Sequence, residues 1–475
     1  MRLVVVSNRV ALPQKGAQPG GMAVALNDTL KADGGIWFGW GGDFAASDQA
    51  SSVQVQKAEG VTYITVSLTK ELFNQYYAGY SNSVLWPLCH SRTDLVDYGS
   101  RDLAGYRQTN KLFAQCLNPF LQEDDLIWIH DYHLIPLAAE LRSWGIQNRI
   151  GFFLHIPVPP PQLMQTLPDH EVIARTLAAY DLIGLQTERD CRNLIEYFQM
   201  QFGAVELSAT RISVFGKTLA IQAFPIGIDV EAFQKATETT PPDHSVERFR
   251  KLASRHGMLI GVDRLDYSKG LPQKFRAFER FLSDPANLAG RAVLTQIAPL
   301  SRADIDAYAS LREELEQITG RILGSYGDLD WTPLFYLNRG YSRECLAHFF
   351  RMSDAALVTP LADGMNLVAK EFIAAQDPKD PGVLILSRFA GAAEQMDSAL
   401  LVNPYDEREI ANAIGEALVM PVSERRERYS DLMEVVRNTD VRKWAREYLA
   451  VLKSPGNPRI RLISPGDSGS SGRVA

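Results

Sequence analysis

A repeated alternation of short apolar runs with longer segments of helical spacing is the feature that most constrains the fold of this chain. Several of the runs are apolar throughout, which is typical of strands covered on both faces of a parallel sheet. The segments between them, such as 171–179 and 190–202, have the spacing of amphipathic helices. Strand–helix alternation predicts an α/β fold. The strands that we expect lie at 3–6, 61–66, 126–129, 150–155, 182–185, 258–262, 293–297, 355–359, 383–386 and 400–402.

The alternation begins twice, which predicts two doubly wound domains of similar size. A polar stretch, 231–246, separates the two series, and we place a boundary near residue 235. The first domain is expected over 1–235 and the second over 236–453. The remaining residues, 454–475, are rich in Pro, Gly and Ser, so we expect a disordered tail there.

Charge and composition exclude several classes of function. The net charge is −7, whereas broad nucleic-acid binding normally needs a basic stripe; a local basic pocket for a phosphorylated small molecule is still compatible. No apolar run is long enough for a transmembrane helix, and the N-terminal residues do not resemble a signal peptide. The four cysteines form no C-x-x-C pair, so we expect no zinc or disulfide framework and a reduced, cytoplasmic compartment.

In doubly wound sheets, ligands bind outside the carboxyl ends of the strands, and two such edges facing each other make a cleft. Residues that bind ligands or carry out chemistry are therefore expected directly after the strands. Gly20 and Gly21 follow the first strand and precede a segment of helical spacing, where backbone N–H groups can approach an anion. A flexible loop with glycines for turn geometry is an equally good reading. No G-x-G-x-x-G with a following acidic residue is present, which disfavours a nicotinamide site.

Histidines and an aspartate follow two further strands. His130 and His133 are three residues apart, but no third metal ligand of suitable spacing is near, so we predict no metal site. Asp131 between them is better interpreted as an acceptor for a hydroxyl group in the cleft. His155 precedes a proline-rich segment that would fix the position of its ring, although a purely structural histidine is the alternative.

Two basic segments follow strands of the second series. Arg264 and Lys269 lie five residues apart in a loop that enters a helix. A planar guanidinium and a point charge together suit a diphosphate, whereas an exposed charged loop is the alternative interpretation. Arg302 comes after the next strand and forms a second basic strand end.

The most informative segment, 360–371, reads PLADGMNLVAKE and follows the strand at 355–359. Gly364 permits close approach of the backbone, and the N–H groups that follow it would point at an anion from a helix start. Glu371 lies near the same helical face as Leu367 and can accept two ribose hydroxyls. Asp363 can accept hydroxyls of a sugar. An ordinary capped helix would have the same pattern.

One motif points elsewhere. Residues 328–332 match D-x-D-x-T, the pattern of aspartyl-phosphate phosphatases, and contain the D-x-D of some metal-dependent glycosyltransferases. A phosphatase nucleophile follows a buried strand, whereas residues 324–327 read as a loop. We therefore disfavour phosphatase chemistry.

Several of these segments occur together and in order in one known family. The chain resembles the trehalose-6-phosphate synthases, glycosyltransferase family 20, from about residue 2 to about residue 452. The segments that carry the resemblance are SNR, the Gly-Gly loop, IWIHDYHL, GFFLHIP, FPIGID, RLDYSKG, LTQIAPLSR and TPLADGMNLVAKEF. RLDYSKG and DGMNLVAKE are specific to that family, whereas the Gly-Gly loop alone is not.

The resemblance implies the GT-B fold, in which two Rossmann-like doubly wound domains face each other across a cleft. The first domain would bind the acceptor and the second the nucleotide sugar, with a last helix at about 440–452 crossing back to the first domain. The implied reaction transfers glucose from UDP-glucose to glucose 6-phosphate with retention, yielding α,α-trehalose 6-phosphate and UDP. No cofactor would be required, although Mg²⁺ could help UDP to leave. The implied partners are these small molecules and further copies of the chain, as a dimer or tetramer, with no nucleic acid or membrane.

The resemblance also implies roles for individual residues. Arg264 and Lys269 would neutralise the leaving diphosphate, Asp363 and His155 would hold donor glucose hydroxyls, and Glu371 would bind the ribose. Further donor contacts are expected from Gly20, Gly21, Tyr341, Met365, Asn366, Leu367, Val368, Ala369 and Lys370. The acceptor would be bound by Arg9 and Arg302 at its phosphate, by Tyr77 and Trp86 as walls, and by Asp131 at a hydroxyl.

Two other functions are compatible with this fold. A glucosylglycerol-phosphate synthase would use glycerol 3-phosphate as acceptor, but the aromatic walls Tyr77 and Trp86, together with Asp131, favour a sugar ring. A non-catalytic sensor of UDP-glucose or glucose 6-phosphate would be expected to have lost donor or acceptor residues. Arg9, Arg264 and the other motif residues are present, which favours the enzyme.

Overall fold

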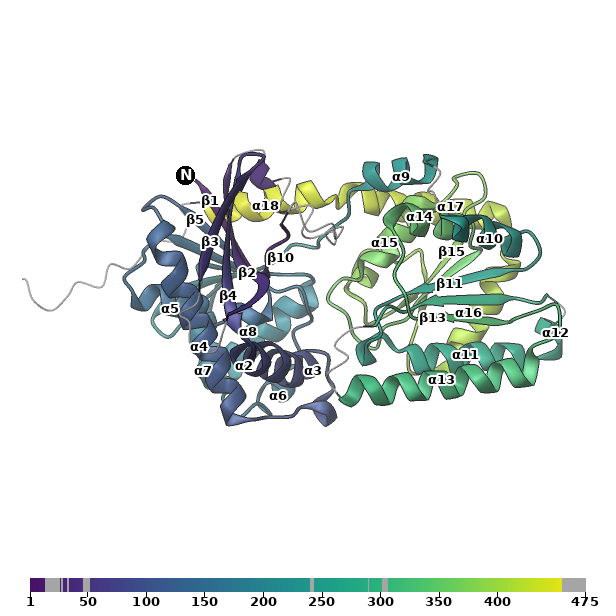
Figure 1. Cartoon of the computed structure of the whole chain (residues 1–475), viewed down its shortest axis with the longest axis horizontal. Helices are drawn as coiled ribbons and strands as arrows, with labels where there is room; N and C mark the ends of the chain where they lie inside the picture. The colour runs from purple at the N-terminus through teal and green to yellow at the C-terminus, as the bar shows by residue number, and fades with distance from the viewer. Residues whose placement is uncertain are drawn as a thin grey trace, which may run out of the picture.

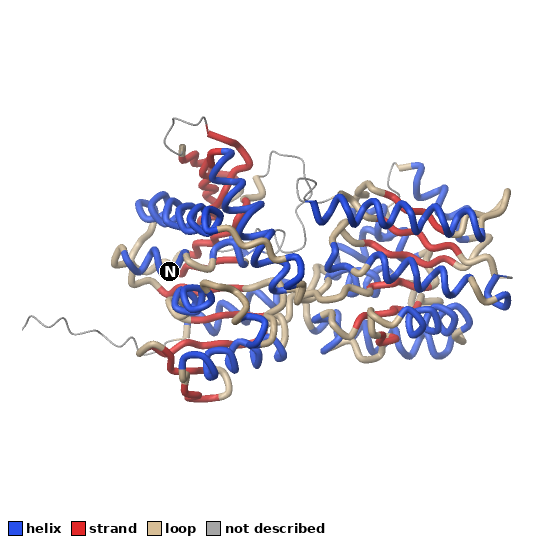
Figure 2. Tube along the Cα trace, turned by 90° about the horizontal axis from the view of Figure 1, so that it is seen from below, coloured by secondary structure: helices blue, strands red, loops and turns tan. Residues whose placement is uncertain are grey.

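A computed structural model describes residues 1–12, 26, 29–31, 34–45, 52–239, 243–288, 290–300 and 306–454. The chain forms two α/β units that stand side by side, each built around its own sheet (Figures 1 and 2). No helix in the described part of the chain is both long and apolar enough to cross a membrane.

The first sheet has ten described strands in the order β3-β4-β2-β1-β5-β6-β7-β10-β9-β8. Its centre is parallel, and antiparallel pairs occur only at its two edges among these strands. The carboxyl ends of its central strands therefore meet at one edge. The strands are β1 (Leu3–Arg9), β2 (Gly35–Ala45), β3 (Val53–Ala58), β4 (Val61–Thr69), β5 (Leu126–His130), β6 (Arg149–Phe153), β7 (Leu182–Leu185), β8 (Val205–Ser208), β9 (Arg211–Val214) and β10 (Lys217–Ala223).

Helices of the first unit connect these strands. Between β4 and β5 the chain runs through a π-helix, η1 (Asn74–Leu85), which lies beside α4 (Ser100–Leu117). Such widened helical turns are frequent at functional sites. The remaining helices are α2 (Lys70–Phe73), α3 (Trp86–Cys89), η2 (Thr93–Leu95), η3 (Asn118–Phe120), η4 (Tyr132–Leu134), α5 (Leu137–Ser143), α6 (Pro161–Met164), α7 (His170–Leu177) and α8 (Glu188–Phe202).

The second sheet is parallel throughout its described strands, in the order β13-β12-β11-β14-β15-β16. In chain order this is 3-2-1-4-5-6, the strand order of the Rossmann fold, and its direction of winding reverses between β11 and β14. Ligands of such sheets bind at that switch point, beyond the strand ends. The strands are β11 (Met258–Val262), β12 (Val293–Ile297), β13 (Leu334–Leu337), β14 (Ala355–Val358), β15 (Val383–Ser387) and β16 (Leu400–Val402).

Helices cover both faces of the second sheet, with α14, α15 and α17 on one side and α11, α13 and α16 on the other (Figure 1). The helices are α9 (Val230–Glu238), α10 (His244–Ala253), η5 (Tyr267–Lys269), α11 (Leu271–Leu282), α12 (Pro285–Leu288), α13 (Asp306–Tyr326), α14 (Arg343–Arg351), α15 (Leu367–Ala375), η6 (Gly391–Glu394), α16 (Glu407–Val419) and α17 (Val422–Asn438).

The polar stretch at 231–246 is mostly helical rather than a plain linker. Helix α9 buries Val230, Phe233 and Ala236, which are three residues apart, against α14 and α15 of the second unit. The expected boundary at residue 235 therefore falls inside α9, and the chain leaves the first sheet before this helix. The expected loop at 324–327 also differs, because its first three residues end α13.

The last helix, α18 (Val441–Lys453), runs back onto the first unit (Figure 1). The Tyr448 ring stacks on Trp128 of β5 at 4.5 Å, and its hydroxyl donates to the Phe152 carbonyl of β6 at 3.1 Å. A Cβ atom at Gly151 would lie 2.2 Å from the Tyr448 oxygen, so glycine in this strand permits the close approach of the helix. Two segments of chain thus connect the units, one before α9 and one before α18.

Each of the ten strands expected from the sequence is present. Strands β2, β3, β8, β9, β10 and β13 were not expected. Strand β2 was not expected because it contains several glycines, which disfavour a strand in isolation. A Cβ at Gly39 would lie 2.1 Å from the Ser7 carbonyl oxygen, so here glycine is required by the neighbouring strand.

Candidate active site

A cleft of 580 Å³ lies at the switch point of the second sheet and is closed on its other side by the first unit. Most of its lining comes from the loops after β11 and β14 and from the start of α15, while three residues come from strand ends of the first sheet. The lining residues are His155, Gln186, Ile226, Val262, Asp263, Arg264, Lys269, Ile297, Pro299, Gly340, Tyr341, Leu346, Asp363, Met365, Asn366, Leu367, Val368 and Glu371.

The loop after β11 is held in shape by Asp266, which is fully buried. Its Oδ1 accepts hydrogen bonds from the backbone N and the hydroxyl of Ser268, at 3.0 and 2.9 Å. The same oxygen accepts from the Trp86 indole N–H of the first unit at 3.4 Å. One carboxylate therefore fixes both the turn that carries the basic residues and an aromatic side chain across the units.

This turn presents two cations to the cleft. Arg264 is exposed, and its Cζ lies 5.6 Å from the centroid of the Trp86 ring. Lys269 Nζ is 2.5 Å from Asp363 Oδ2 of the neighbouring loop. Two positive groups at the switch point make this end of the cleft suited to a bound diphosphate.

A buried polar network stabilises the loop after β11. Lys274 of α11 is fully buried, and its Nζ donates to Asp263 Oδ2 at 2.7 Å and to Gln296 Oε1 at 3.1 Å. A buried charge pair is tolerated when both partners are hydrogen-bonded, and it then fixes local geometry. Sequence reasoning missed this network, because its members come from β12, α11 and the end of β11.

The loop after β14 has the backbone shape of a binding site. Asn366 has a φ of 72°, which is uncommon for a residue with a side chain, and its Nδ2 donates to Asp363 Oδ2 at 3.0 Å. Strain of this kind is held in place by surrounding structure and clusters at ligand sites. Among the described residues no side chain caps the N-terminus of α15, so its first N–H groups remain available to an anion.

Helix α15 turns one acidic side chain toward the cleft and one basic side chain away from it. Glu371 lines the cleft, and burial raises its pKa to about 7 despite the opposing charge of Arg343. Lys370 points to the far side, where its Nζ donates to the Ile226 carbonyl at 2.9 Å and to Thr439 Oγ1 at 3.1 Å. Burial lowers the pKa of Lys370 to about 7.

Two of the residues expected to contact the donor are not among those that line the cleft. Ala369 and Lys370 do not line the cleft, because successive side chains of a helix point about 100° apart. Lys370 joins α15 to the two segments that connect the units. The other expected donor residues that the structure describes, Tyr341 and Met365–Val368 among them, do line it.

The first unit faces the cleft with its own strand ends. Asp131, after β5, has a φ of 76°, and its Oδ1 accepts from the backbone N of His155 at 3.3 Å. His155 is partly buried, and the loss of solvent around its ring lowers its pKa to about 3, so it is neutral at physiological pH. Gly364 of the second unit packs directly on the His155 backbone: a Cβ there would lie 2.0 Å from the carbonyl oxygen.

The described residues that are expected to bind the acceptor, Arg9, Tyr77, Trp86 and Asp131, lie on the first unit and outside the lining of the 580 Å³ cleft. Arg9 is exposed, with its Cζ 5.5 Å from the Trp40 ring centroid. Tyr77 of η1 stacks on His133, with 5.5 Å between ring centroids. Trp86 links the expected acceptor residues to the donor cleft, because its ring contacts Arg264. Gly20, Gly21 and Arg302 lie outside the described residues.

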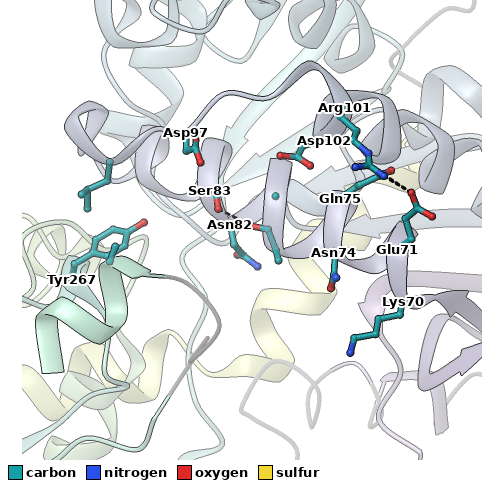
Figure 3. Close-up of a pocket in the computed structure, with 14 residues that line it drawn as sticks. Lys70, Glu71, Asn74, Gln75, Asn82, Ser83, Asp97, Arg101, Asp102 and Tyr267 are labelled. Atoms are coloured by element: carbon teal, nitrogen blue, oxygen red, sulfur yellow. Dashed lines mark hydrogen bonds and ion pairs between the residues drawn. The ribbon is translucent and has the colours of Figure 1, made fainter.

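A second hollow of 770 Å³ adjoins η1 and α4 and reaches Tyr267 of the second unit (Figure 3). Two of its charged side chains, Arg101 and Glu71, form an ion pair at 2.6 Å. Asn74 and Asn82 also line it. It contains no convergence of cations and helix N–H groups among the described residues, so we assign the donor chemistry to the smaller cleft.

The D-x-D-x-T segment lies apart from both hollows. Asp328 and Asp330 form ion pairs with Arg291 at 3.4 and 2.7 Å, and a bridge joins Asp328 to Trp331. No group of three side chains suited to a metal occurs in the described ranges. Phosphatase chemistry would require these aspartates to follow a buried strand. Here they follow α13 instead.

The chain was compared with known proteins. The model of glycosyltransferase family 20 matches residues 5–454. A trehalose-6-phosphate synthase of Sinorhizobium fredii is 46% identical over 452 residues, which cover 94% of this chain and 97% of that protein.

Two solved structures have the same fold. An E. coli trehalose-6-phosphate structure bound with UDP-2-fluoro glucose has a TM-score of 0.92 at 44% identity, covering 96% of this chain and 99% of that one. A Burkholderia xenovorans α,α-trehalose-phosphate synthase in complex with glucose-6-phosphate has a TM-score of 0.91 at 43% identity, with coverages of 96% and 100%. The expected GT-B fold is confirmed, and the chain belongs to glycosyltransferase family 20.

Proposed function

We propose that this protein is a retaining glucosyltransferase that moves glucose from UDP-glucose to glucose 6-phosphate and forms α,α-trehalose 6-phosphate and UDP. The observation that carries the proposal is the meeting of Arg264, Lys269 and the uncapped N-terminus of α15 in one cleft. Relatives of this family that bind a UDP-glucose analogue and glucose-6-phosphate support it.

The donor lies along the loops of the second unit. Glu371 accepts the two ribose hydroxyls, and its position in the cleft near Leu367 supports this role. The diphosphate lies between the first N–H groups of α15 and the side chains of Arg264 and Lys269. The base is held near Tyr341.

Binding of the diphosphate redistributes the charges already present. Lys269 is paired with Asp363. A diphosphate attracts the ammonium group and frees the carboxylate of Asp363 to accept hydroxyls of the transferred glucose. As glucose departs, negative charge grows on UDP, and the two cations and the helix dipole stabilise that charge.

Retention follows from attack on the same face of the sugar. A double displacement would need a carboxylate nucleophile beside the reacting carbon. Asp363 is engaged by Lys269 and Asn366 and is better suited to hold hydroxyls. The acceptor hydroxyl therefore attacks from the side of the leaving phosphate, which takes the acceptor's proton.

The acceptor lies against the first unit. Arg9 and Arg302 bind its phosphate, Tyr77 and Trp86 form walls around the ring, and Asp131 accepts a hydroxyl. Trp86 is held by Asp266 and contacts Arg264, so the acceptor wall is tied to the turn that binds the leaving group.

No cofactor is required, because Arg264, Lys269 and the helix terminus supply positive charge at the leaving group; Mg²⁺ would at most stimulate the release of UDP. The protein acts in the cytoplasm as a homo-oligomer, a dimer or a tetramer, on small molecules alone.

The test is UDP release from UDP-glucose with glucose 6-phosphate or glycerol 3-phosphate, followed by NMR of the product. A 1,1-linked α,α disaccharide phosphate is expected. Glucosylglycerol phosphate would overturn the acceptor assignment, and tight UDP binding without turnover would favour a sensor. Arg264→Ala should abolish most of the turnover, whereas the control Arg291→Ala, on the ion-paired surface segment, should leave it unchanged.

A further inference from the structure

The two ring nitrogens of His155 both face protein groups. Nε2 lies 3.2 Å from His130 Nδ1, and Nδ1 lies 3.4 Å from Gln186 Nε2. His130 ends β5, His155 follows β6, and Gln186 follows β7, so three neighbouring strands of the first sheet bring these side chains together. His130 and Gln186 are buried, 1% and 2% exposed, whereas His155 is only partly buried and reaches the cleft.

The direction of the hydrogen bonds can be worked out from Ile226, in the segment after β10. Its backbone N–H donates to Gln186 Oε1 at 3.0 Å. A backbone nitrogen can only donate, so the atom it meets is the amide oxygen, and Gln186 turns its NH₂ group toward His155. An NH₂ group can only donate as well. Nδ1 of His155 must therefore accept.

This direction determines which ring nitrogen carries the proton in each of the two histidines. Burial lowers the pKa of both rings, to about 3 for His155, so both are neutral at physiological pH. A neutral imidazole that accepts at Nδ1 carries its proton on Nε2. His155 Nε2–H then donates to His130 Nδ1, and His130 carries its own proton on Nε2, a buried atom with no other partner among the described residues.

We propose that Gln186 is a positioning residue that selects the Nε2–H form of His155 and fixes the orientation of its ring, with His130 as the second anchor. His155 is then a neutral, immobile wall at the end of the cleft nearest Asp363, and not a group that carries protons. The consequence for turnover rests on the proposed function, whereas the form of the ring does not.

The anchor of Gln186 is itself held from the other unit. Lys370 of α15 donates to the Ile226 carbonyl at 2.9 Å, while the N–H of the same residue binds Gln186. The hydrogen-bond chain therefore begins on the helix whose N-terminus faces the diphosphate and ends at His130. Through it the position of α15 and the ring of His155 are linked by three consecutive contacts, and a fourth joins His155 to His130.

The wild-type protein provides the first test. Neutron diffraction from perdeuterated crystals locates the deuterons on a histidine ring without any substitution. A deuteron on His155 Nε2 and none on Nδ1 is expected. A deuteron on Nδ1, or on both nitrogens, would overturn the proposal, and neither result depends on which sugar acceptor the enzyme uses.

The Gln186→Leu variant tests whether Gln186 selects this form. Histidine ¹⁵N shifts, assigned with His155→Asn, should report Nε2–H in the wild type and a mixture of the two forms in the variant. The matched control is Gln376→Leu, because Gln376 is also buried and also accepts from a backbone N–H, that of Gly382, but contacts no histidine. An unchanged His155 signal in folded Gln186→Leu would refute the selecting role.

Kinetics distinguish positioning from general damage. Gln186→Leu should lower kcat by about 10²-fold, the typical cost of a small misplacement of the reacting groups. The Kd for UDP should stay near the wild-type value, because the proposed nucleotide contacts, Arg264, Lys269, Tyr341 and the start of α15, do not include Gln186 or His155. An equal loss of UDP affinity would show that the substitution damages the cleft as a whole and would contradict the proposal. If no transfer occurs even in the wild type, the proposed function fails while the neutron result still stands.

Discussion

Gly364→Ala should impair the enzyme by forcing its two units apart. Gly364 belongs to the loop after β14, and it contacts the backbone of His155 and Ile156 on the other unit. A Cβ atom would lie 2.0 Å from the His155 carbonyl oxygen and 3.1 Å from the Ile156 Cα. Gly364 has no positive φ, so alanine fits the backbone conformation and the effect is one of contact alone.

The size of the effect follows from that distance. An ordinary Cβ contact begins at 3.4 Å, so relief requires a separation of about 1.4 Å, the difference between 3.4 and 2.0 Å. Neither side can yield by rotating a side chain, because both atoms belong to the backbone. A displacement of about 1 Å can cost about 100-fold in rate, which corresponds to about 2.7 kcal/mol of transition-state stabilisation.

The assay is steady-state UDP release, together with a binding isotherm for UDP. We expect kcat/KM to fall by about 100-fold while UDP still binds, since Arg264, Lys269, Tyr341 and the N-terminus of α15 all belong to the second unit. The control is Gly320→Ala in α13, where an added Cβ meets nothing within 4 Å. A Gly364→Ala enzyme with kcat/KM within about threefold of the wild type would refute the reasoning.

Three further predictions concern α15 and α18. The pKa of Glu371 is raised to about 7, so the affinity for UDP-glucose should rise between pH 6 and 8 as the carboxylate ionises, and Glu371→Gln should flatten this KM profile. The folded protein holds the Glu371 proton more tightly than the unfolded chain does. The protonated Glu371 therefore contributes stability below its unfolded pKa, and this contribution is lost as pH rises through 7. The melting temperature of the ligand-free protein should accordingly fall over that range. Lys370→Met should destabilise the protein by about 1–3 kcal/mol by leaving buried acceptors unpaired, and the exposed control Lys379→Met should not; equal melting temperatures would contradict this. Trp444→Ala should cost about 3–5 kcal/mol in urea unfolding, and a smaller loss would mean that α18 packs loosely on the first sheet.

The donor side of the cleft was predictable because its residues follow strands directly. In a doubly wound sheet the ends of β11 and β14 meet at the switch point, so RLDYSKG and DGMN had to lie close together. The family resemblance predicted donor contacts for both Glu371 and Lys370, although only Glu371 lines the cleft. Which of two neighbouring residues faces a ligand depends on the rotation of the helix, and that is set by packing against the connecting segments.

Contacts between residues far apart in the sequence could not be predicted from the sequence alone. Gln186 carries no motif of its own and His130 was considered only as a metal ligand, and it is the strand order β5-β6-β7 that brings them to His155. The helices α9 and α10 were missed for another reason. Their single buried stripe is narrow and the rest of each helix is polar, so the segment read as a linker.

The return of α18 has a consequence for the order in which the protein can be made. Trp444 and Tyr448 cover Trp128, Phe153 and the glycines of β6 and β7, which belong to the half of the chain that leaves the ribosome first. Until the final residues of the last helix emerge, that half exposes an aromatic surface. The first unit can therefore complete its fold only after α18 has been synthesised, and chaperone dependence during translation should be concentrated in that unit.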